Sequence, residues 1–504
     1  MQLNKIFIFH FCLIIFILQG VSSVFALTTG QKPTLSEKEN YLSSPPRKFR
    51  PVLKSVLPGP DLKQIAYVVR SANKSAVVLN DTKQKEFSGI QKGSLIFGPN
   101  GEHFAYVAYK GNKSLPILDG KAGKTYSGIA NLKFSPDGSN LVFLGEKGDK
   151  QFVVLNGKAG PHYDRIARKG SPVFSPDSSR LAYVALKGEK SVLVQNNTQE
   201  GPQYNSIALP EFSPDSSEIA YAAKKNDKWR VVRGGTERNK KYKKITQLLY
   251  SPNSQHFTYS AQKGNHWLKI VDGEVKHKAL KVGPTMFSSN SKRIAYSIKN
   301  KNGWKVIVDG KKGKAYKKIG VFNFGPNSDS YAYMVETKDK KAAIVANGKK
   351  GKEFDSVGRP IFSPDGNYIA YRAKKDKKWF IVKDGKRGKG YDYVRRPFFS
   401  SDSEHIAYTA IQDNKMIMVC DGKEQDPYAG VSRPYFSPDS QHLAYSASND
   451  GENWFLVVDG HKADKRFNGF LKGVPLKYNE SNKLHTLTLR LPGPYFFLYQ
   501  VQIE

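Results

Sequence analysis

The feature of this chain that most constrains its fold is a short repeat that recurs at nearly constant intervals. An aromatic residue, most often the Phe of a Phe-Ser-Pro-Asp turn, recurs every 37 to 40 residues, and an apolar-Ala-Tyr triplet follows most copies. These anchor residues are Phe97, Phe134, Phe174, Phe212, Tyr250, Phe287, Phe324, Phe362, Phe399 and Phe436. Degenerate copies surround Pro60 and Tyr478. Most of the 504 residues are therefore one unit used many times.

The signals inside each unit are those of β-strands and turns. In the copy that starts at Phe362, residues 364–366 have turn chemistry, and residues 368–373 alternate as a strand. A second strand at residues 379–382 is followed by Asp-Gly at residues 384–385, which is a tight hairpin signal, and by a last short strand. We therefore predict four short strands per unit and no helix.

A four-stranded unit of this length cannot bury both faces of its sheet alone, so it must stack on copies of itself. Radial stacking into a β-propeller achieves this and also protects the strand edges. The Phe-Ser-Pro-Asp-Gly turn followed by Ile-Ala-Tyr resembles the repeat of the TolB-type, WD-repeat-like propellers. The resemblance extends from about Pro58 to the C-terminus and implies a propeller fold. The mixed α/β domain that precedes the propeller in TolB has no counterpart here.

We predict an all-β propeller of about twelve four-stranded blades within residues 48–504. Residues 484–491 and 495–503 supply middle strands of a final unit whose last strand is missing, and residues 48–53 match a strand that could complete it. Two six-bladed rings, with a boundary near residue 285, are the favoured arrangement, since the resemblance to TolB implies rings of that size. One large ring is the alternative.

The N-terminus predicts export. Lys5 precedes an apolar run at residues 6–18, and small residues end at Ala26, so we interpret residues 1–26 as a removable signal peptide. An uncleaved anchor is the alternative. Residues 27–47 are rich in Ser, Pro, Lys and Glu and predict a flexible spacer. No later apolar stretch approaches the length of a bilayer crossing, so we expect a periplasmic or extracellular protein without a transmembrane segment once the signal is removed.

No cofactor or metal site is predicted. After removal of the signal peptide Cys420 is the one cysteine, and its apolar neighbours predict a buried strand residue. Four histidines occupy the same position before the second strand, one per blade: His103, His256, His405 and His442. Because equivalent positions on different blades lie a whole sheet apart, we interpret these histidines as solvated turn residues and not as metal ligands.

Catalytic residues are likewise not predicted. The Gly-x-Ser-x-Gly nucleophile turn of hydrolases that carry similar propellers is absent from the sequence. The aspartates of the turns are expected to bond their own backbone: Asp137, Asp177, Asp215, Asp365 and Asp439. We therefore favour a non-enzymatic binding protein. The alternative is a lyase or hydrolase that acts on an anionic polysaccharide.

Charge is the strongest functional signal. Lys and Arg number 80 against 44 Asp and Glu, which gives a formal net charge of +36 and makes an acidic partner plausible. Lysines recur in the hairpin after the third strand and define a basic rim: Lys121, Lys124, Lys311, Lys314, Lys386 and Lys389. The alternative interpretation is that these lysines only keep the protein soluble and blunt the strand edges.

A group of arginines has a more specific position. Arg359, Arg396 and Arg433 each lie three residues before an anchor, with Arg395 and Arg168 nearby, where the chain enters the inner strand of the next blade. We predict that they line one mouth of the central channel and bind carboxylate, sulfate or phosphate groups. Structural packing on aromatic residues such as Phe398 and Tyr435 is the alternative. The partner would be an acidic polysaccharide or an acidic protein surface, since export argues against nucleic acid.

Overall fold

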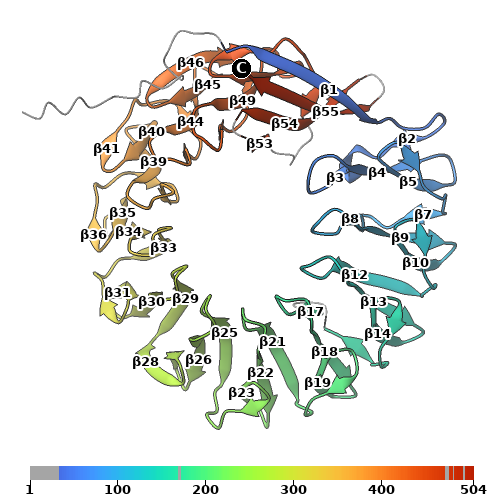
Figure 1. Cartoon of the computed structure of the whole chain (residues 1–504). Helices are drawn as coiled ribbons and strands as arrows, with labels where there is room; N and C mark the ends of the chain where they lie inside the picture. Colours follow the sequence, from blue (N-terminus) through green and yellow to red (C-terminus); the bar gives the residue numbers. More distant parts are fainter. Residues whose placement is uncertain (1–32, 168–171, 471–475, 481, 492–493) are drawn as a thin grey trace, which may run out of the picture.

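Twelve antiparallel sheets form one closed ring around a central opening (Figure 1). The computed structural model describes residues 33–167, 172–470, 476–480, 482–491 and 494–504. Within these residues the single helical element is a 3-10 turn, η1 (Leu53–Ser55), and no helix is long and apolar enough to cross a membrane. The predicted all-β propeller of twelve blades is confirmed.

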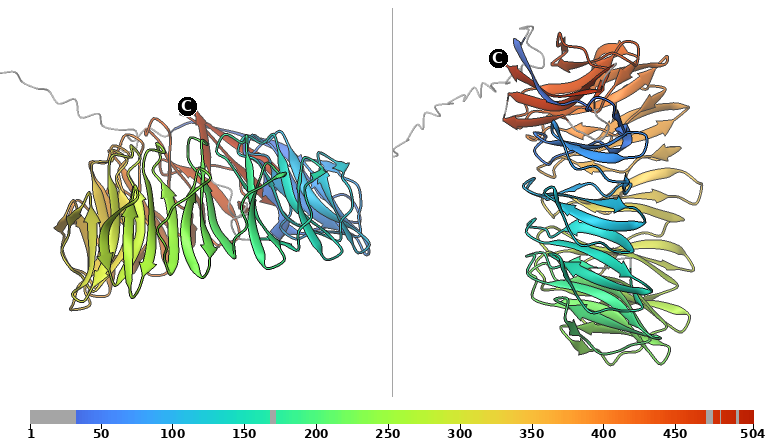
Figure 2. Two further views of the ribbon diagram at one scale, coloured as in Figure 1. Left: turned by 90° about the horizontal axis from the view of Figure 1, so that it is seen from below. Right: turned by 90° about the vertical axis from the view of Figure 1, so that its right-hand side faces the viewer.

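The blades are numbered 1 to 12 along the chain, and each begins with its inner strand, which in several blades is divided into two short segments. These first strands are β2 (Arg50–Pro51), β7 (Gly89–Ile90), β12 (Gly128–Phe134), β16 (Arg165–Ile166), β21 (Ser206–Phe212), β25 (Lys244–Tyr250), β29 (Lys281–Phe287), β33 (Lys318–Phe324), β37 (Ser356–Val357), β42 (Tyr393–Val394), β47 (Gly430–Val431) and β52 (Gly469–Phe470). In blade 8, β33 is followed outward by β34 (Tyr331–Glu336), β35 (Ala342–Ala346) and β36 (Lys349–Lys350) (Figure 1). The strands run across the thickness of the ring (Figure 2).

The single large ring, which was the alternative arrangement, is the one that the structure adopts, and the favoured pair of six-bladed rings is wrong. Residue 285, near the expected boundary, lies inside β29, the first strand of an ordinary blade. Thr285 accepts a hydrogen bond from Lys269 of blade 6, so blade 7 packs on the preceding blade without a break. The physical reason is that the number of blades in a ring depends on the angle between neighbouring blades, which the packing at each interface sets.

The core is a series of layers between adjacent blades. In β18 (Leu181–Lys187) five successive residues are buried, because the second strand of a blade is covered on both faces. Ala182 packs with Ile207 and Tyr221 of blade 5, whereas Tyr183 on the opposite face packs with Val142 of blade 3. The apolar-Ala-Tyr triplet therefore places a small side chain toward one neighbour and a large one toward the other.

Blade 12 is completed by the N-terminal segment. Its β54 (Lys483–Arg490) and β55 (Tyr495–Ile503) are followed outward by β1 (Leu35–Ser43), which pairs with β55 from Leu35 opposite Ile503 to Ser43 opposite Phe496. Glu37 of β1 accepts hydrogen bonds from the backbone N–H of Asp464 (2.7 Å) and from the Tyr499 hydroxyl. The first and last parts of the chain thus share one sheet.

This closure corrects two predictions. The expected flexible spacer at residues 27–47 contains β1, and residues 48–53 do not complete the last blade, because β2 pairs with β4 (Ile65–Arg70) in blade 1. The sequence of β1 hides its strand character, since it carries charged and polar residues and lies at the sheet edge, where no alternation of buried residues is required. The predicted signal peptide at residues 1–26 lies outside the described residues.

Candidate functional site

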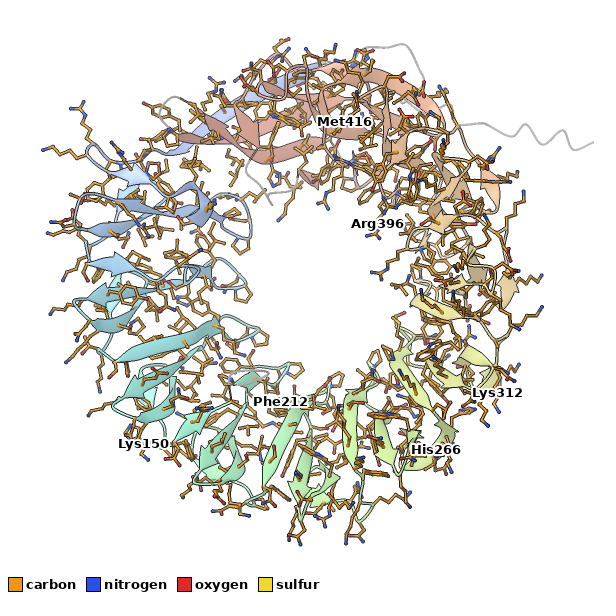
Figure 3. All side chains as sticks on the ribbon, turned by 180° about the vertical axis from the view of Figure 1, so that it is seen from behind. Lys150, Phe212, His266, Lys312, Arg396 and Met416 are labelled. Atoms are coloured by element: carbon orange, nitrogen blue, oxygen red, sulfur yellow. The ribbon has the colours of Figure 1, made fainter. Side chains whose placement is uncertain are left out.

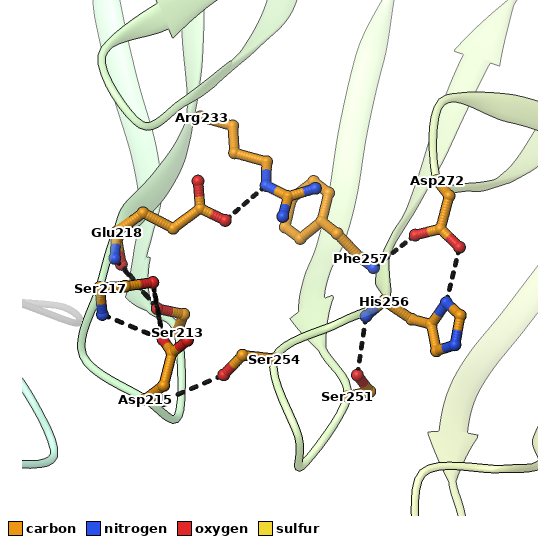
Figure 4. Close-up of polar contacts among 10 residues, drawn as sticks. All are labelled: Ser213, Asp215, Ser217, Glu218, Arg233, Ser251, Ser254, His256, Phe257 and Asp272. Carbon is orange, nitrogen blue, oxygen red and sulfur yellow. Dashed lines mark hydrogen bonds and ion pairs between the residues drawn. The ribbon is translucent and has the colours of Figure 1, made fainter.

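The Ser-Pro-Asp turns join neighbouring blades. In blade 5 the Asp215 carboxylate accepts hydrogen bonds from the Ser213 hydroxyl (2.6 Å) and the Ser217 N–H (3.0 Å), while the Asp215 N–H donates to Ser254 Oγ of blade 6 (3.0 Å; Figure 4). The same bond between blades joins Asp137 to Ser178, Asp177 to Ser216, Asn253 to Ser291, Asp365 to Ser403 and Asp402 to Ser440.

The turn aspartates hold the backbone, as predicted. Each predicted aspartate accepts a hydrogen bond from the backbone N–H two residues after it, in the pairs Ser139–Asp137, Ser179–Asp177, Ser217–Asp215, Asn367–Asp365 and Gln441–Asp439. The hydroxyl of the serine two residues before each aspartate donates a second hydrogen bond to it. These hydrogen bonds to the charged form, with those from Ser179 and Ser217, lower the pKa of Asp177 and Asp215 to about 2. A carboxylate held in this way is an acceptor for the turn and not a proton donor.

The four histidines are not merely solvated turn residues, which corrects the prediction. Nδ1 of each lies 2.6 to 2.8 Å from a carboxylate of the third-strand hairpin of its own blade, in the pairs His103–Asp119, His256–Asp272, His405–Asp421 and His442–Asp459. The hydrogen bond that the His442 ring donates to the Asp459 carboxylate raises the pKa of His442. The ring of His256 also stacks on the ring of the anchor Phe287 in the next blade, with 6.4 Å between the two ring centres. These side chains are therefore part of the blade ends.

The predicted arginines lie at interruptions of the inner strands in blades 9, 10 and 11. In blade 9 the inner strand consists of β37 and β38 (Ile361–Phe362), and both pair with β39 (Ile369–Lys375). Residues 358–360 lie between these two segments, opposite only two residues of β39. The extra residue makes a bulge with Arg359 at its centre. Blades 10 and 11 repeat the bulge around Arg396 and Arg433. A proline follows each of these arginines and suits a position without a ladder hydrogen bond.

These arginines are exposed and contact uncharged groups. Arg359 Nη2 donates to Asn323 Oδ1 of blade 8 (2.7 Å), and Arg395 Nη1 donates to the Val431 carbonyl of blade 11 (3.2 Å). The Arg396 guanidinium lies 5.9 Å from the Phe398 ring, and the Arg433 guanidinium lies 4.6 Å from the Tyr435 ring. Figure 3 shows Arg396 at the inner rim of the ring. The contacts with Phe398 and Tyr435 are the aromatic packing that was the alternative to anion binding. They leave part of each guanidinium free.

Arg168, the remaining predicted member, lies outside the described residues. The basic-rim lysines are exposed, but they lie on or just after the outermost strands, such as β41 (Lys386–Arg387), far from the opening. Figure 3 shows Lys312, next to Lys311, at the outer circumference. Lys389 is partly neutralised by Glu424 at 2.9 Å. The structure thus separates the arginines from the lysines across the width of a blade.

A cavity of about 470 Å³ lies beside the arginines. Arg433 lines it together with aromatic rings of three successive blades: Phe398, Tyr435, Phe436 and Tyr478. The Arg433 Nε donates to the Tyr435 hydroxyl (2.6 Å), which fixes the guanidinium on the ring and leaves its terminal nitrogens as a fork for an anion. The described residues that line this cavity include no carboxylate or imidazole.

The sequence reasoning missed the bulge that holds each arginine. The signal for it was the repeated Arg-Pro dipeptide, since proline inside an inner strand marks an interruption of the ladder.

No protein-family model and no curated protein matches the chain. Solved structures that it resembles include the eukaryotic initiation factor, with 14% identity over 73% of this chain and 96% of that chain (TM-score 0.35). A TolB-type protein from Agrobacterium tumefaciens shares 15% identity over 45% of this chain and 93% of that one (TM-score 0.23). The Dos1 propeller shares 11% identity over 59% of this chain and 90% of that one (TM-score 0.27). The fold assignment follows from the twelve sheets themselves, and these likenesses add nothing on activity or partners.

Proposed function

We propose that this protein is an exported, non-enzymatic propeller of the cell envelope or exterior that binds an acidic polysaccharide or an acidic protein surface. The partner would contact Arg359, Arg395, Arg396 and Arg433 at the inner rim. The observation that carries the proposal is their placement on three consecutive blades without carboxylate partners among the described residues. Four arginines elsewhere have such partners, in the pairs Arg230–Glu237, Arg233–Glu218, Arg293–Asp309 and Arg490–Glu39.

The energetics favour arginine for this role. A guanidinium has a planar set of donors that matches a carboxylate or sulfate in two parallel hydrogen bonds, and it is less strongly hydrated than an ammonium group. Stacking on Phe398 and Tyr435 pre-orients two of the guanidinium groups, so less side-chain freedom is lost on binding. Diffuse attraction by the net charge of +36 would assist the encounter.

A lyase or hydrolase acting on an anionic polysaccharide is the second candidate. The Tyr435 hydroxyl, 2.6 Å from Arg433 Nε, is the one observation that favours it, because a tyrosine beside a cation can transfer a proton. Breakdown of heparin or polyuronate by the parent protein, abolished in Tyr435→Phe, would support this function over simple binding.

The test of the proposed function compares two triple variants that lose the same formal charge. One carries Arg359→Ala, Arg396→Ala and Arg433→Ala, and the other has three alanines at the outer positions Lys121, Lys311 and Lys386. Binding of immobilised heparin and of poly-glutamate should weaken with added salt for all proteins. The arginine variant should lose at least tenfold more affinity, since each charge-assisted hydrogen bond is worth about 1.5 to 3 kcal/mol. Equal losses would show that diffuse charge, and not this site, holds the ligand.

A further inference from the structure

The residue three positions before each anchor varies systematically around the inner rim. In blades 9 to 11 it is arginine, whereas in blades 5 to 8 it is uncharged: Leu209, Gln247, Pro284 and Val321. Leu209 and Val321 are each 43% exposed, unusually for apolar side chains of this size. The rim therefore has a cationic sector next to an uncharged, largely apolar one.

An apolar cavity opens in the second sector, between blades 7 and 8. It has a volume of about 430 Å³, and Pro284, Met286, Ile319, Val321 and Phe322 line it. Among its lining residues only Ser297 and Tyr296 carry polar side-chain atoms, and the Tyr296 hydroxyl already shares a hydrogen bond with His277 Nδ1 (2.7 Å). This cavity suits a large apolar group and offers little to a charged one.

The cavity and the cationic sector meet at the inner strand of blade 8, because Val321, which lines the cavity, and Arg359 each lie three residues before the anchors of neighbouring blades. Phe322 lines the cavity, and its neighbour Asn323 accepts the hydrogen bond from Arg359 at 2.7 Å. Asn323 also donates to the Pro360 carbonyl at 3.2 Å, so the bulge of blade 9 is fixed against blade 8. A ligand seated in the cavity would meet Arg359 first and then the arginines of blades 10 and 11.

We propose that the inner rim binds an acidic polypeptide that inserts one large apolar side chain into the cavity between blades 7 and 8 and lays acidic residues along the arginines of blades 9 to 11. The inference rests on the proposed function and narrows its partner to a polypeptide. Charge complementarity with the arginine sector selects acidic residues, and the apolar lining selects an aromatic or branched aliphatic anchor, a group that acidic polysaccharides lack.

The test uses three synthetic peptides: one Phe followed by a short Gly-Ser spacer and four Glu, the same peptide with Ser in place of Phe, and the Phe peptide with Gln in place of Glu. The parent protein should bind the Phe-Glu peptide at least tenfold more tightly than the Ser-Glu peptide, since burial of a Phe side chain is worth about 1.5 to 3 kcal/mol. Fluorescence anisotropy of labelled peptides measures the affinities.

Val321→Asp and Leu209→Asp are a matched pair of variants, because both replace an equally exposed apolar residue three positions before its anchor. Val321→Asp should abolish the advantage of the Phe-Glu peptide, and Leu209→Asp should retain it. Val321→Ser, which adds no charge, should reduce the advantage partly and guards against a folding defect in Val321→Asp. Equal effects of the Asp substitutions at 209 and 321, or equal binding of the Phe-Glu and Ser-Glu peptides by the parent, would overturn the inference.

The two proposals fail in different ways. If the arginine triple variant binds the Ser-Glu peptide as well as the parent does, the proposed function fails. If that variant loses binding but the Phe residue confers no advantage, the function stands and the apolar anchor is wrong. If heparin binds more tightly than the Phe-Glu peptide and Val321→Asp has no effect on either, the partner is a polysaccharide and the inference is overturned.

Discussion

A buried lysine between blades 6 and 7 gives the sharpest prediction on stability. Lys269 lies in β27 (His266–Val271) and is 0% exposed. Its Nζ donates to Ser260 Oγ and to Thr285 Oγ1, both at 2.6 Å, and lies 5.6 Å from the centre of the Tyr296 ring. Burial lowers the pKa of this amine from 10.5 to about 7. The folded state therefore resists the charge that the unfolded chain accepts readily.

The magnitude and sign follow from this difference in pKa. A fall from 10.5 to about 7 corresponds to about 5 kcal/mol of cost for the charged form. Below pH 7 the amine is protonated in both states and the full cost applies. Between about pH 7 and 10.5 the unfolded state binds more protons, so the free energy of unfolding rises with pH until both states are neutral.

Lys269→Met removes the amine and keeps the length of the side chain. The variant should be more stable than the parent by about 2 to 3 kcal/mol at pH 6, because the loss of two hydrogen bonds, about 1 kcal/mol each, offsets part of the gain. At pH 10 the difference in the free energy of unfolding between the variant and the parent should vanish or change sign. Urea unfolding at pH 6, 8 and 10 measures this, with Lys263→Met as the control, since Lys263 is exposed at the end of the neighbouring strand. Parallel pH dependences of all three proteins would refute the reasoning.

Two further predictions concern the joints of the ring. Glu37→Ala should release β1 and speed amide exchange in β1 and β55. The expected local loss of stability is about 2 kcal/mol, because the carboxylate accepts three hydrogen bonds. The control Lys38→Ala, at the exposed neighbouring residue, should leave amide exchange unchanged. Ser440→Ala should lower stability by about 1 to 2 kcal/mol in thermal unfolding, since it leaves the Asp402 N–H without its bond across blades 10 and 11. Ser139→Ala, which affects only bonds within one turn, should have a smaller effect, and equal effects would contradict a joining role.

Most blades were predictable because the turn and the apolar-Ala-Tyr triplet of each copy fix its strands locally. Blade 12 is the exception, because its outermost strand is β1. The number of blades in one ring was not predictable, because it depends on the angle between neighbouring blades. That angle is set by the packing of residues such as Ala182 and Tyr183 against the blades on either side, and a small difference at one interface accumulates around the ring.

At the candidate site, the sequence located the arginines because their distance from the anchor is fixed. It did not reveal the partners of the histidines, since Asp119 comes 16 residues after His103 and meets it only when the hairpin folds. Lys269 was missed for a similar reason. A lysine in a strand ordinarily faces solvent, and its burial depends on Thr285 of the next blade.

The shared sheet of β1 and β55 sets the order of events during synthesis. Glu37 can accept its hydrogen bond from Tyr499, 462 residues later in the sequence, only after that residue has been synthesised, so β1, the first of the described strands, pairs late. Until then the molecule is an open arc whose two terminal blades present apolar faces, such as the one where Ile65 and Tyr67 later meet Phe496. A chain cut short before Tyr495 keeps these faces bare and is a ready substrate for proteases or for association with another arc.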